Sequence, residues 1–510
     1  MRSGRCRWIV GTLSLLLVIP IPLLSLAGGQ TSAAATEDKP GELVHEQWFT
    51  YTMDGEPMGW MRIVVWRTDE HYRTKELTVL RIARAGTVVE STSRSTYVER
   101  HDGTPVRVSL REVEGTEAVE YEWDFTGPQV SEKLTQFGRT RTTTRNHPQG
   151  DWLMPAEGRR HTQQQIQAGQ SEIRYRAIKA ELGLLPVKIT MRREGETTFT
   201  VNGQETLVSQ WRYQVEGLPI VATEYRCPAG HKVYQGAQVG YGYMEASLTN
   251  REAALEAVRG SPPELMAAMI VIPDRPVPDV MDTERVTLRL RVRQGDLPEL
   301  PEAGGQRIVE RGEGSVTTVF EPARPLPATE EEVADHAYRE ASPMIDINDE
   351  AVAELVEATK PEEPLCQQEL AEGLHAFVYE YIVDKELDVA FATASETART
   401  RQGDCTEHAI LLAALLRGHG IAARVAEGLV YVTDYAGERH VFSWHMWTQA
   451  LLDGRWVDLD ATLPERRAHA GYVLTSVSSL ADRDRPMEMA TTLKLAGNLE
   501  IEVLEVEYDR

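Results

Sequence analysis

The sequence has few cysteines, fewer basic than acidic residues, and no long apolar stretch beyond its first 30 residues. Four cysteines in 510 residues exclude a disulfide-stabilised scaffold and a series of zinc ribbons. The 54 basic and 78 acidic residues give a formal net charge of −24, which argues against non-specific binding to nucleic acid, because that requires a basic face. The longest later apolar runs, 265–272 and 409–416, are far shorter than the roughly 20 residues of a membrane-spanning helix.

The remaining composition is that of a folded protein, with 42% hydrophobic and 26% charged residues. At about 150 residues per domain, the length favours two to four domains. Changes in the hydrophobic pattern predict an α+β protein, with a β-rich antiparallel N-terminal domain followed by helices packed on an antiparallel sheet. The predicted parts are a signal peptide (1–27), a linker (28–44), a β-rich domain (45–250), a connecting β/Pro-rich region (251–345), a core (346–480) and a C-terminal β-hairpin (481–510).

The first residues have the pattern of an export signal. Arg2, Arg5 and Arg7 precede an apolar stretch, Trp8–Leu26, and a small residue, Ala27, follows it. Cleavage there would remove three arginines and no acidic residue, leaving 51 basic and 78 acidic residues and a net charge of −27. We therefore expect an exported protein, periplasmic or secreted, and an uncleaved membrane anchor is the alternative.

Residues 45–250 mostly alternate between apolar and polar side chains, as the strands of an antiparallel sheet do. Asp54-Gly55 separates two such runs, 48–53 and 58–66, and predicts a hairpin with a two-residue turn. The segment 159–182 is compatible with a polar helix. No catalytic motif occurs in this half of the chain, so the residues alone assign it no role.

In the second half of the chain, the spacing of apolar residues changes from that of strands to that of helices and back to that of strands. Prolines interrupt the region after residue 251, which contains two expected strands, at 286–292 and 316–320. Strands return from about Val425, and the tail around Gly497-Asn498 predicts a final hairpin. Between them, the segments with a helical period are 352–356, 365–382 and 410–416.

One cysteine lies in a sequence context that activates thiols. Gly403 allows a tight approach before a helix, and Asp404 with Glu407 three residues later forms a capping-box pattern with Asp404 as the N-cap. Cys405 is then the first helical residue, where the aligned peptide dipoles stabilise a thiolate. A thiolate attacks carbonyl carbon, and the N–H groups at the helix start can bind the developing oxyanion. The alternative is a buried structural cysteine at a helix start.

A second predicted hairpin brings a histidine and a carboxylate together. Asp453-Gly454 predicts a two-residue turn, and counting from that turn places Asp460 opposite Trp447. Asp460 then shares a sheet face with His445 and lies on its diagonal, where backbones are about 7–8 Å apart and longer side chains can meet. Asp458 lies two residues farther from His445. The register therefore selects Asp460 as the group that orients the imidazole, and a lone core histidine is the alternative.

Five short segments of the second half occur together as they do in one known family. They are Gly-Asp-Cys-Thr-Glu-His-Ala (403–409), Ala-Leu-Leu-Arg (414–417), Gly-Ile-Ala-Ala-Arg-Val (420–425), His-x-Trp (445–447) and Gly-Arg-Trp-Val-Asp-Leu-Asp-Ala-Thr (454–462). In this combination the chain resembles, over roughly residues 345–480, the transglutaminase-like family of bacterial exported cysteine proteases with a papain-like core. Met446 and Ala461 replace the alanine and proline usual in the family, and neither change removes a catalytic group.

The resemblance implies a core in which a cysteine at a helix start packs against a sheet carrying histidine and aspartate. It assigns the nucleophile to Cys405, the base to His445 and the orienting acid to Asp460, without cofactor or metal. The implied chemistry is attack on an amide carbonyl through a thioester, most simply hydrolysis of a protein or peptide substrate in the cell envelope. Amine transfer with cross-linking is one alternative, and a non-catalytic binding or scaffold protein of the envelope is another.

Other candidate residues carry less specific signals. His440 and His445 are five residues apart and His408 lies one turn into the helix, but neither spacing is a recognised zinc-ligand pattern, and His408 is expected to support the site. Cys227 and Cys366 either pair in an oxidising compartment or stay separate buried thiols. No residue pattern identifies the side chain of an oxyanion hole, and the chain contains no internal repeat and no phosphate-binding glycine loop.

Overall fold

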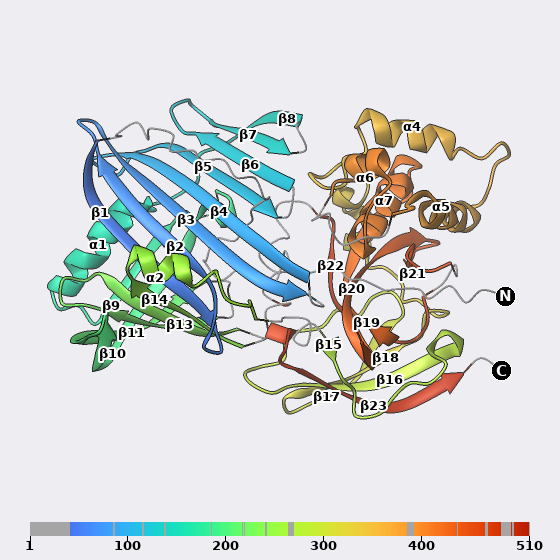
Figure 1. Ribbon diagram of the computed structural model, residues 1–510. Helices are drawn as coiled ribbons and strands as arrows, with labels where there is room; N and C mark the ends of the chain where they lie inside the picture. Colours follow the sequence, from blue (N-terminus) through green and yellow to red (C-terminus); the bar gives the residue numbers. More distant parts are fainter. Residues whose placement is uncertain are drawn as a thin grey trace. The chain divides into compact units, whose positions relative to one another are not determined.

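The computed structural model describes residues 41–508 in two compact units (Figure 1). The N-terminal unit lies within Leu17–Leu265 and the C-terminal unit within Met266–Arg510. The fold is α+β, as predicted. The predicted signal peptide, 1–27, lies outside the described residues. Residues also left out of the description are 85–86, 115–116, 137–138, 185, 217, 219, 240–241, 264–269, 385–391, 436, 465–467, 481–490 and 492–493.

The N-terminal unit is built on one antiparallel sheet of 14 strands, in the order β8-β7-β6-β5-β4-β3-β2-β1-β14-β13-β12-β11-β10-β9. Two meanders are joined where β1 pairs with β14. This confirms the β-rich antiparallel N-terminal half. The strands are β1 (Glu42–Met53), β2 (Glu56–Arg67), β3 (His71–Arg84), β4 (Thr87–Arg100), β5 (Pro105–Glu114), β6 (Glu117–Asp124), β7 (Val130–Gln136), β8 (Arg139–Arg145), β9 (Glu172–Ala177), β10 (Val187–Val201), β11 (Gln204–Val215), β12 (Val221–Arg226), β13 (Lys232–Val239) and β14 (Gly242–Thr249).

The structure confirms some of the local predictions for this unit and corrects others. Asp54 and Gly55 have φ values of 49° and 86°, and they form the predicted turn between β1 and β2. Strand β1 begins at Glu42, inside the predicted linker 28–44. The segment predicted as a polar helix divides, because Ile173 is buried on a strand that pairs with β10. Its elements are helix α1 (Pro155–Gln167), strand β9 and the short helix η1 (Ala180–Leu182), and helix α2 (Arg251–Glu256) follows the sheet.

The C-terminal unit packs helices and a small sheet on opposite faces of a five-stranded sheet. One core cluster joins the helices to Met446 and Ala450, and another joins Phe320 to Trp447 and Tyr472. The five-stranded sheet contains β15 (Ile270–Val271), β19 (Ala423–Tyr435), β20 (Glu438–Leu452), β21 (Arg455–Leu459) and β22 (Tyr472–Ser478). The helices are α3 (Glu330–Ala334), α4 (Glu350–Ala358), α5 (Gln367–Tyr381), α6 (Ala394–Thr400) and α7 (Cys405–Gly418), with η3 (Val280–Asp282) and η4 (His336–Tyr338).

The small sheet combines strands that are distant in the sequence. Its order is β17 (Gln306–Gly312), β18 (Ser315–Phe320), β16 (Thr283–Val292) and β23 (Leu499–Tyr508). The expected strands at 286–292 and 316–320 are therefore present. The region 251–345, predicted as a connection, supplies most of this sheet, and β23 of the predicted C-terminal hairpin (481–510) pairs with β16 instead of with a neighbouring arm. The domain boundaries drawn from the sequence stay predictions.

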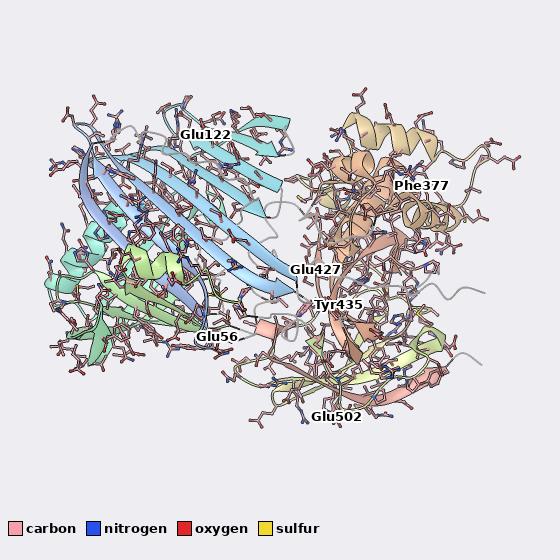
Figure 2. The ribbon with its side chains drawn as sticks, in the orientation of Figure 1. Glu56, Glu122, Phe377, Glu427, Tyr435 and Glu502 are labelled. Atoms are coloured by element: carbon pink, nitrogen blue, oxygen red, sulfur yellow. The ribbon has the colours of Figure 1, made fainter. Side chains whose placement is uncertain are left out.

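Helix α7 forms the centre of the C-terminal unit. Its residues from Cys405 to Arg417 are all buried, which explains why apolar residues surround the whole helix and not one face. Figure 2 labels Phe377 of α5, which stacks on Tyr381 at 5.1 Å between ring centroids and packs against the same core. None of the helices in the described ranges is both long and apolar enough to span a membrane.

Candidate active site

The start of α7 has the predicted capping geometry. The Asp404 carboxylate accepts a hydrogen bond from the Thr406 N–H at 2.8 Å, and the Asp404 N–H donates to Oε2 of Glu407 at 2.9 Å. Gly403 has a φ of 151°, and a Cβ there would lie 2.2 Å from Cβ of Glu407, so only glycine fits. Cys405 is consequently the first residue of the helix, as its position in the sequence predicted.

The β20–β21 hairpin follows the predicted register until it ends. Asp453 and Gly454 have φ values of 48° and 73°, typical of the two-residue turn. Gln449 pairs with Asp458, as counted from the sequence, and the last pair joins Thr448 to Leu459. The expected pairing of Trp447 with Asp460 lies beyond the end of this ladder. Asp460 is thus the first residue after the strand and is placed by contacts other than strand pairing.

His445 and Asp460 are in direct contact. His445 Nε2 lies 2.6 Å from Oδ2 of Asp460, and the two residues are 3% and 2% exposed. Asp458, the carboxylate that the register rejected, is bonded elsewhere: it accepts hydrogen bonds from the indole N–H of Trp447 at 2.8 Å and from the side chain of Gln449 at 2.7 Å. The choice of Asp460 over Asp458 as the partner of His445 agrees with these contacts.

The thiol of Cys405 hydrogen-bonds to His445, which lies on β20 where one edge of that strand is not paired with another described strand. On that edge, β20 pairs with β15 up to Ser443 and with β21 from Thr448 onward. Residues 444–447 therefore have no strand partner there within the described residues, and the backbone N–H of Met446 bonds to the sulfur of Cys405. Because Asp460 occupies Nε2, the ring presents Nδ1 to the sulfur.

Three further residues hold Asp460, and the sequence analysis did not identify them in this role. The Tyr472 hydroxyl donates to Oδ2 of Asp460 at 2.5 Å, and the Thr462 hydroxyl and N–H donate to Oδ1 at 2.6 and 3.0 Å. His375 Nε2 is 2.8 Å from the Asp460 carbonyl oxygen. Thr462, two residues after the aspartate, carried a recognisable turn signal. Tyr472 and His375 carried none, because each comes from a different element.

The charges of this cluster favour an imidazolium–carboxylate pair. Burial alone would lower the pKa of His445, but the charge and hydrogen bond of Asp460, with the hydrogen bond of Cys405, raise it to about 10. The pKa of Asp460 is lowered: burial opposes ionisation, but the His445 charge and the hydrogen bonds from His445, Thr462 and Tyr472 outweigh it. At neutral pH the pair is therefore ionised.

The pKa of Cys405 differs from the sequence-based expectation of a stabilised thiolate. Burial raises the pKa of the thiol and the Asp404 charge raises it further, whereas the hydrogen bond and charge of His445 lower it. Cys405 is only 4% exposed, so desolvation of the charged form is the largest cause of the raised pKa. The closed site thus holds a neutral thiol beside an imidazolium, and the pair must lose one proton before the sulfur can attack.

Burial disfavours ionisation of both carboxyl groups of the capping box. Burial, together with the charge of Asp404, raises the pKa of Glu407 well above its ordinary value. Burial also raises the pKa of Asp404, but its hydrogen bonds with Thr406 and Glu407 oppose this. Of the two carboxyl groups, Asp404 is the one whose charge raises the pKa of the neighbouring Cys405 thiol.

The remaining candidate residues have structural contacts. Nδ1 of His408 lies 2.6 Å from the carbonyl oxygen of Asp404, which supports the helix start as expected. His440 bonds to the hydroxyl of Tyr431 at 3.0 Å. Cys227 and Cys366 are free thiols and do not pair. The sulfur of Cys366 instead accepts a hydrogen bond at the start of α5.

Comparison with known proteins finds one family model that matches part of this region. Residues 354–461 match the family model of the transglutaminase-like superfamily. The matched segment begins in α4 and ends just after the β20–β21 hairpin, so it contains Cys405, His445 and Asp460. No curated protein matches the chain.

Three solved structures are similar to parts of the chain. A β-barrel-like protein of a domain of unknown function from Brucella abortus is 13% identical over 41% of this chain and 97% of its own, with a TM-score of 0.33. A candidate cysteine protease from Cytophaga hutchinsonii is 14% identical over 44% and 88%, with a TM-score of 0.29. A candidate protease from Parabacteroides distasonis is 12% identical over 69% and 63%, with a TM-score of 0.17. All three scores lie below 0.5, so the function proposed below depends on the side-chain geometry and not on these likenesses.

Proposed function

We propose that this domain of the transglutaminase-like superfamily is a thiol enzyme that hydrolyses amide bonds, with Cys405, His445 and Asp460 as its catalytic residues. The observation that supports this most directly is that His445 contacts both partners, the sulfur of Cys405 and, through Nε2, Asp460 at 2.6 Å. A nucleophile, a base and an orienting acid in that sequence of contacts are the parts of a catalytic triad.

The proposed reaction proceeds through a thioester. After the Cys405–His445 pair loses one proton, the sulfur attacks the amide carbonyl carbon and forms a C–S bond. His445 gives its proton to the amide nitrogen, the C–N bond breaks and the amine leaves. Water then attacks the thioester while His445 accepts one of its protons; the C–S bond breaks, the carboxylic acid leaves, and the Cys405 thiolate is restored beside protonated His445. Asp460 orients the ring and stays ionised throughout.

The start of α7 contributes to oxyanion binding in this proposal. The backbone N–H of Cys405 belongs to the first turn, where no carbonyl within the helix can accept it. In the tetrahedral intermediate the substrate oxygen becomes negative next to this N–H, so a hydrogen bond there is stronger in the transition state than in the ground state. Removal of one such donor typically costs about 10²–10³ in rate.

The activity is tested by incubating the full-length protein with a peptide library and detecting new termini by mass spectrometry. We expect cleavage by the wild type, none by Cys405→Ala, and wild-type cleavage by Cys227→Ala, which removes a free thiol of the N-terminal unit. A second assay, with a glutamine-containing peptide and an added fluorescent amine, shows whether the acyl group is transferred to water or to an amine. Release of a carboxylic acid supports hydrolysis, and incorporation of the amine would establish transfer instead.

The burial of the site favours one competing function, that of a non-catalytic envelope scaffold. Cys405, His445 and Asp460 are 4%, 3% and 2% exposed, so substrate requires an opening that exposes the sulfur. Alkylation with a thiol-directed electrophile at neutral pH, read at Cys405 by peptide mass spectrometry, distinguishes the two. If native Cys405 reacts no faster than in denatured protein and no peptide is cleaved, the scaffold function is favoured over the enzyme.

We further propose that the chain is exported and that its substrate is a protein or peptide of the cell envelope. The support is the run of Arg2, Arg5 and Arg7 before the apolar stretch that ends at Leu26. Fractionation of a Gram-negative host, followed by sequencing of the purified protein's first residues, tests it. A mature chain that begins near residue 28 outside the cytoplasm is expected. A full-length chain in the cytoplasm would contradict the proposal.

A further inference from the structure

A polar cavity lies in the N-terminal unit, which contains none of the residues given a catalytic role above. Its volume is about 160 Å³. It is lined by α1 and by strands of both meanders, among them β1, β3, β9, β12 and β13. The lining therefore joins parts of the chain from His45 to Gln235. Charged side chains contribute much of it, which is unusual for the inside of a protein.

Cations outnumber carboxylates in this lining. Arg159, Lys179, Arg226 and Lys232 are the basic residues, and Glu76 and Glu224 are the acidic ones, so the formal charge is +2. Glu224 forms an ion pair with Arg226 at 2.5 Å. Glu76 attracts Lys179 electrostatically. Glu76 also attracts Arg159, and Glu224 also attracts Lys232, so the two lining carboxylates are shared among four cations.

Two of the lining cations, Arg159 and Lys232, are strongly desolvated. Burial lowers the pKa of Lys232, and the charges of Arg226 and Lys179 lower it further, while the charge of Glu224 opposes this. Burial also lowers the pKa of Arg159, against the attraction of Glu99 and Glu76. A cation loses hydration when buried and regains this energy only from an anion or a hydrogen-bond acceptor. The cavity therefore provides a place where an added anion would be stabilised.

The two histidines of the lining do not change this charge at neutral pH. Burial is the main cause that lowers the pKa of His45 to about 4, and burial with the nearby arginines lowers that of His231. Both rings are then neutral and stack at 5.2 Å between centroids. His231 Nδ1 bonds to Gln163 at 2.8 Å. Neutral imidazoles can add hydrogen bonds to a ligand without adding charge.

Buried polar atoms near the cavity lack partners within the described residues. Nε of Arg226 is buried without a hydrogen bond. The hydroxyls of Thr74 and Thr78, which flank Glu76 on the same side of β3, are also buried and unpaired. Because nearly all buried polar atoms in proteins are hydrogen-bonded, such a group indicates a space that water or a ligand fills.

We propose that this cavity binds a small dianion that carries a phosphate group or two carboxylates. The charge of +2 matches two negative charges, and the basic residues come from α1, β12, β13 and the residue just before η1, as in a site that surrounds its ligand. The volume of the cavity limits the size of the ligand. A cavity of about 150 Å³ holds one benzene, so the ligand has on the order of six to ten non-hydrogen atoms and no long acyl chain.

The proposal is tested by calorimetric titration of the full-length protein with inorganic phosphate, succinate and, as a neutral probe of similar size, glycerol. Binding of phosphate or succinate with an affinity that falls as salt rises is expected, since the attraction is ionic. Binding of phosphate would identify a phosphate group as the preferred ligand group, and binding of succinate would identify a pair of carboxylates. Binding of neither, or equal binding of glycerol, overturns the proposal.

Two variants locate the binding. Arg159→Gln is expected to weaken it at least about tenfold, because a charge-assisted hydrogen bond is lost. Arg94→Gln on β4 makes the same change at an exposed position and should leave the affinity unaltered. Arg159→Lys, which keeps the charge, should restore most of it. Circular dichroism of each variant reports folding. A folded Arg159→Gln protein that binds as the wild type does would place the anion elsewhere and contradict the site.

Discussion

Nε2 of His445 and Oδ2 of Asp460 lie 2.6 Å apart, although the ladder between their strands ends one residue before the aspartate. The carboxylate is held there by the hydroxyls of Tyr472 and Thr462. Because both residues are almost fully buried, the contact stabilises an ion pair that water does not screen. This contact governs the protonation state of the whole site, and the predictions below follow from it and from its neighbours.

Asp460→Asn should remove the charge that keeps His445 protonated. The pKa of His445, raised to about 10 in the wild type, should fall, and the rate of the proposed hydrolysis should drop about 10²–10⁴-fold, as for loss of a group that supports acid–base catalysis. The pH dependence of kcat, with Asp434→Asn as an exposed control on the same sheet, measures both effects. A wild-type pH profile in the Asp460→Asn protein would show that the contact does not set the protonation of His445.

The reactivity of Cys405 should increase with pH above neutrality. Burial and Asp404 raise the pKa of this thiol, so the thiolate is scarce at pH 7 and forms as the pH rises. The alkylation rate at Cys405, measured between pH 6 and 10, should climb through this range. A rate independent of pH would mean that the thiolate already exists at neutral pH.

Asp404→Asn tests the cause of that raised pKa. Asparagine is also a good N-cap, so the helix start is preserved while the negative charge is removed. Alkylation of Cys405 at neutral pH should become severalfold faster, with the midpoint of its pH profile at lower pH. Asp434→Asn again serves as the control. A slower rate with an unchanged midpoint would indicate that Asp404 acts through helix structure and not through charge.

Tyr472→Phe should destabilise the fold because Asp460 loses a buried donor. The expected loss is about 1–3 kcal/mol in the free energy of unfolding at neutral pH, the usual range for a hydrogen bond to a charged group. The pKa of Asp460 is lowered in the folded state, so its ionisation stabilises the protein above the ordinary value of 3.8 and ceases to do so as the pH falls through the folded-state pKa. The difference between variant and wild type should therefore shrink in acid.

Denaturant unfolding at pH 7 and at lower pH measures this difference. Tyr508→Phe provides the matched control, because its hydroxyl donates to the Pro278 carbonyl oxygen at an exposed position and its loss should cost little. Equal destabilisation by the two substitutions would argue that the hydroxyl of Tyr472 contributes no more than a surface hydrogen bond.

Leu412→Ala should test whether α7 is the core of the C-terminal unit. Leu412 is fully buried, and truncation of such a side chain typically costs about 2–5 kcal/mol. Leu365→Ala makes the same change where the side chain is 48% exposed, and it should cost far less. Unfolding of both variants, followed by tryptophan fluorescence, measures the difference. Similar costs for the two would indicate that α7 is not the core helix.

The sequence alone determined the features that depend on neighbouring residues. Asp54-Gly55 and Asp453-Gly454 form their turns because both positions require positive φ, and Asp404 and Glu407 cap α7 from within one turn of helix. The register of the second hairpin followed from its turn as far as Leu459, and counting one residue further selected Asp460, which contacts outside the ladder hold in place. All of these are short-range effects, which chain geometry decides almost independently of the rest of the molecule.

Only the tertiary structure decided what depends on distant parts of the chain. Strand β23 pairs with β16, about 200 residues earlier, and Tyr472 reaches Asp460 from another strand of the sheet. Packing also reversed the expected effect on Cys405: the helix start favours a thiolate, but enclosure of the sulfur raises its pKa. The physical reason is that local sequence patterns determine where the chain turns and how neighbouring strands pair. The exclusion of solvent and the contacts between distant residues depend on how all helices and strands pack together.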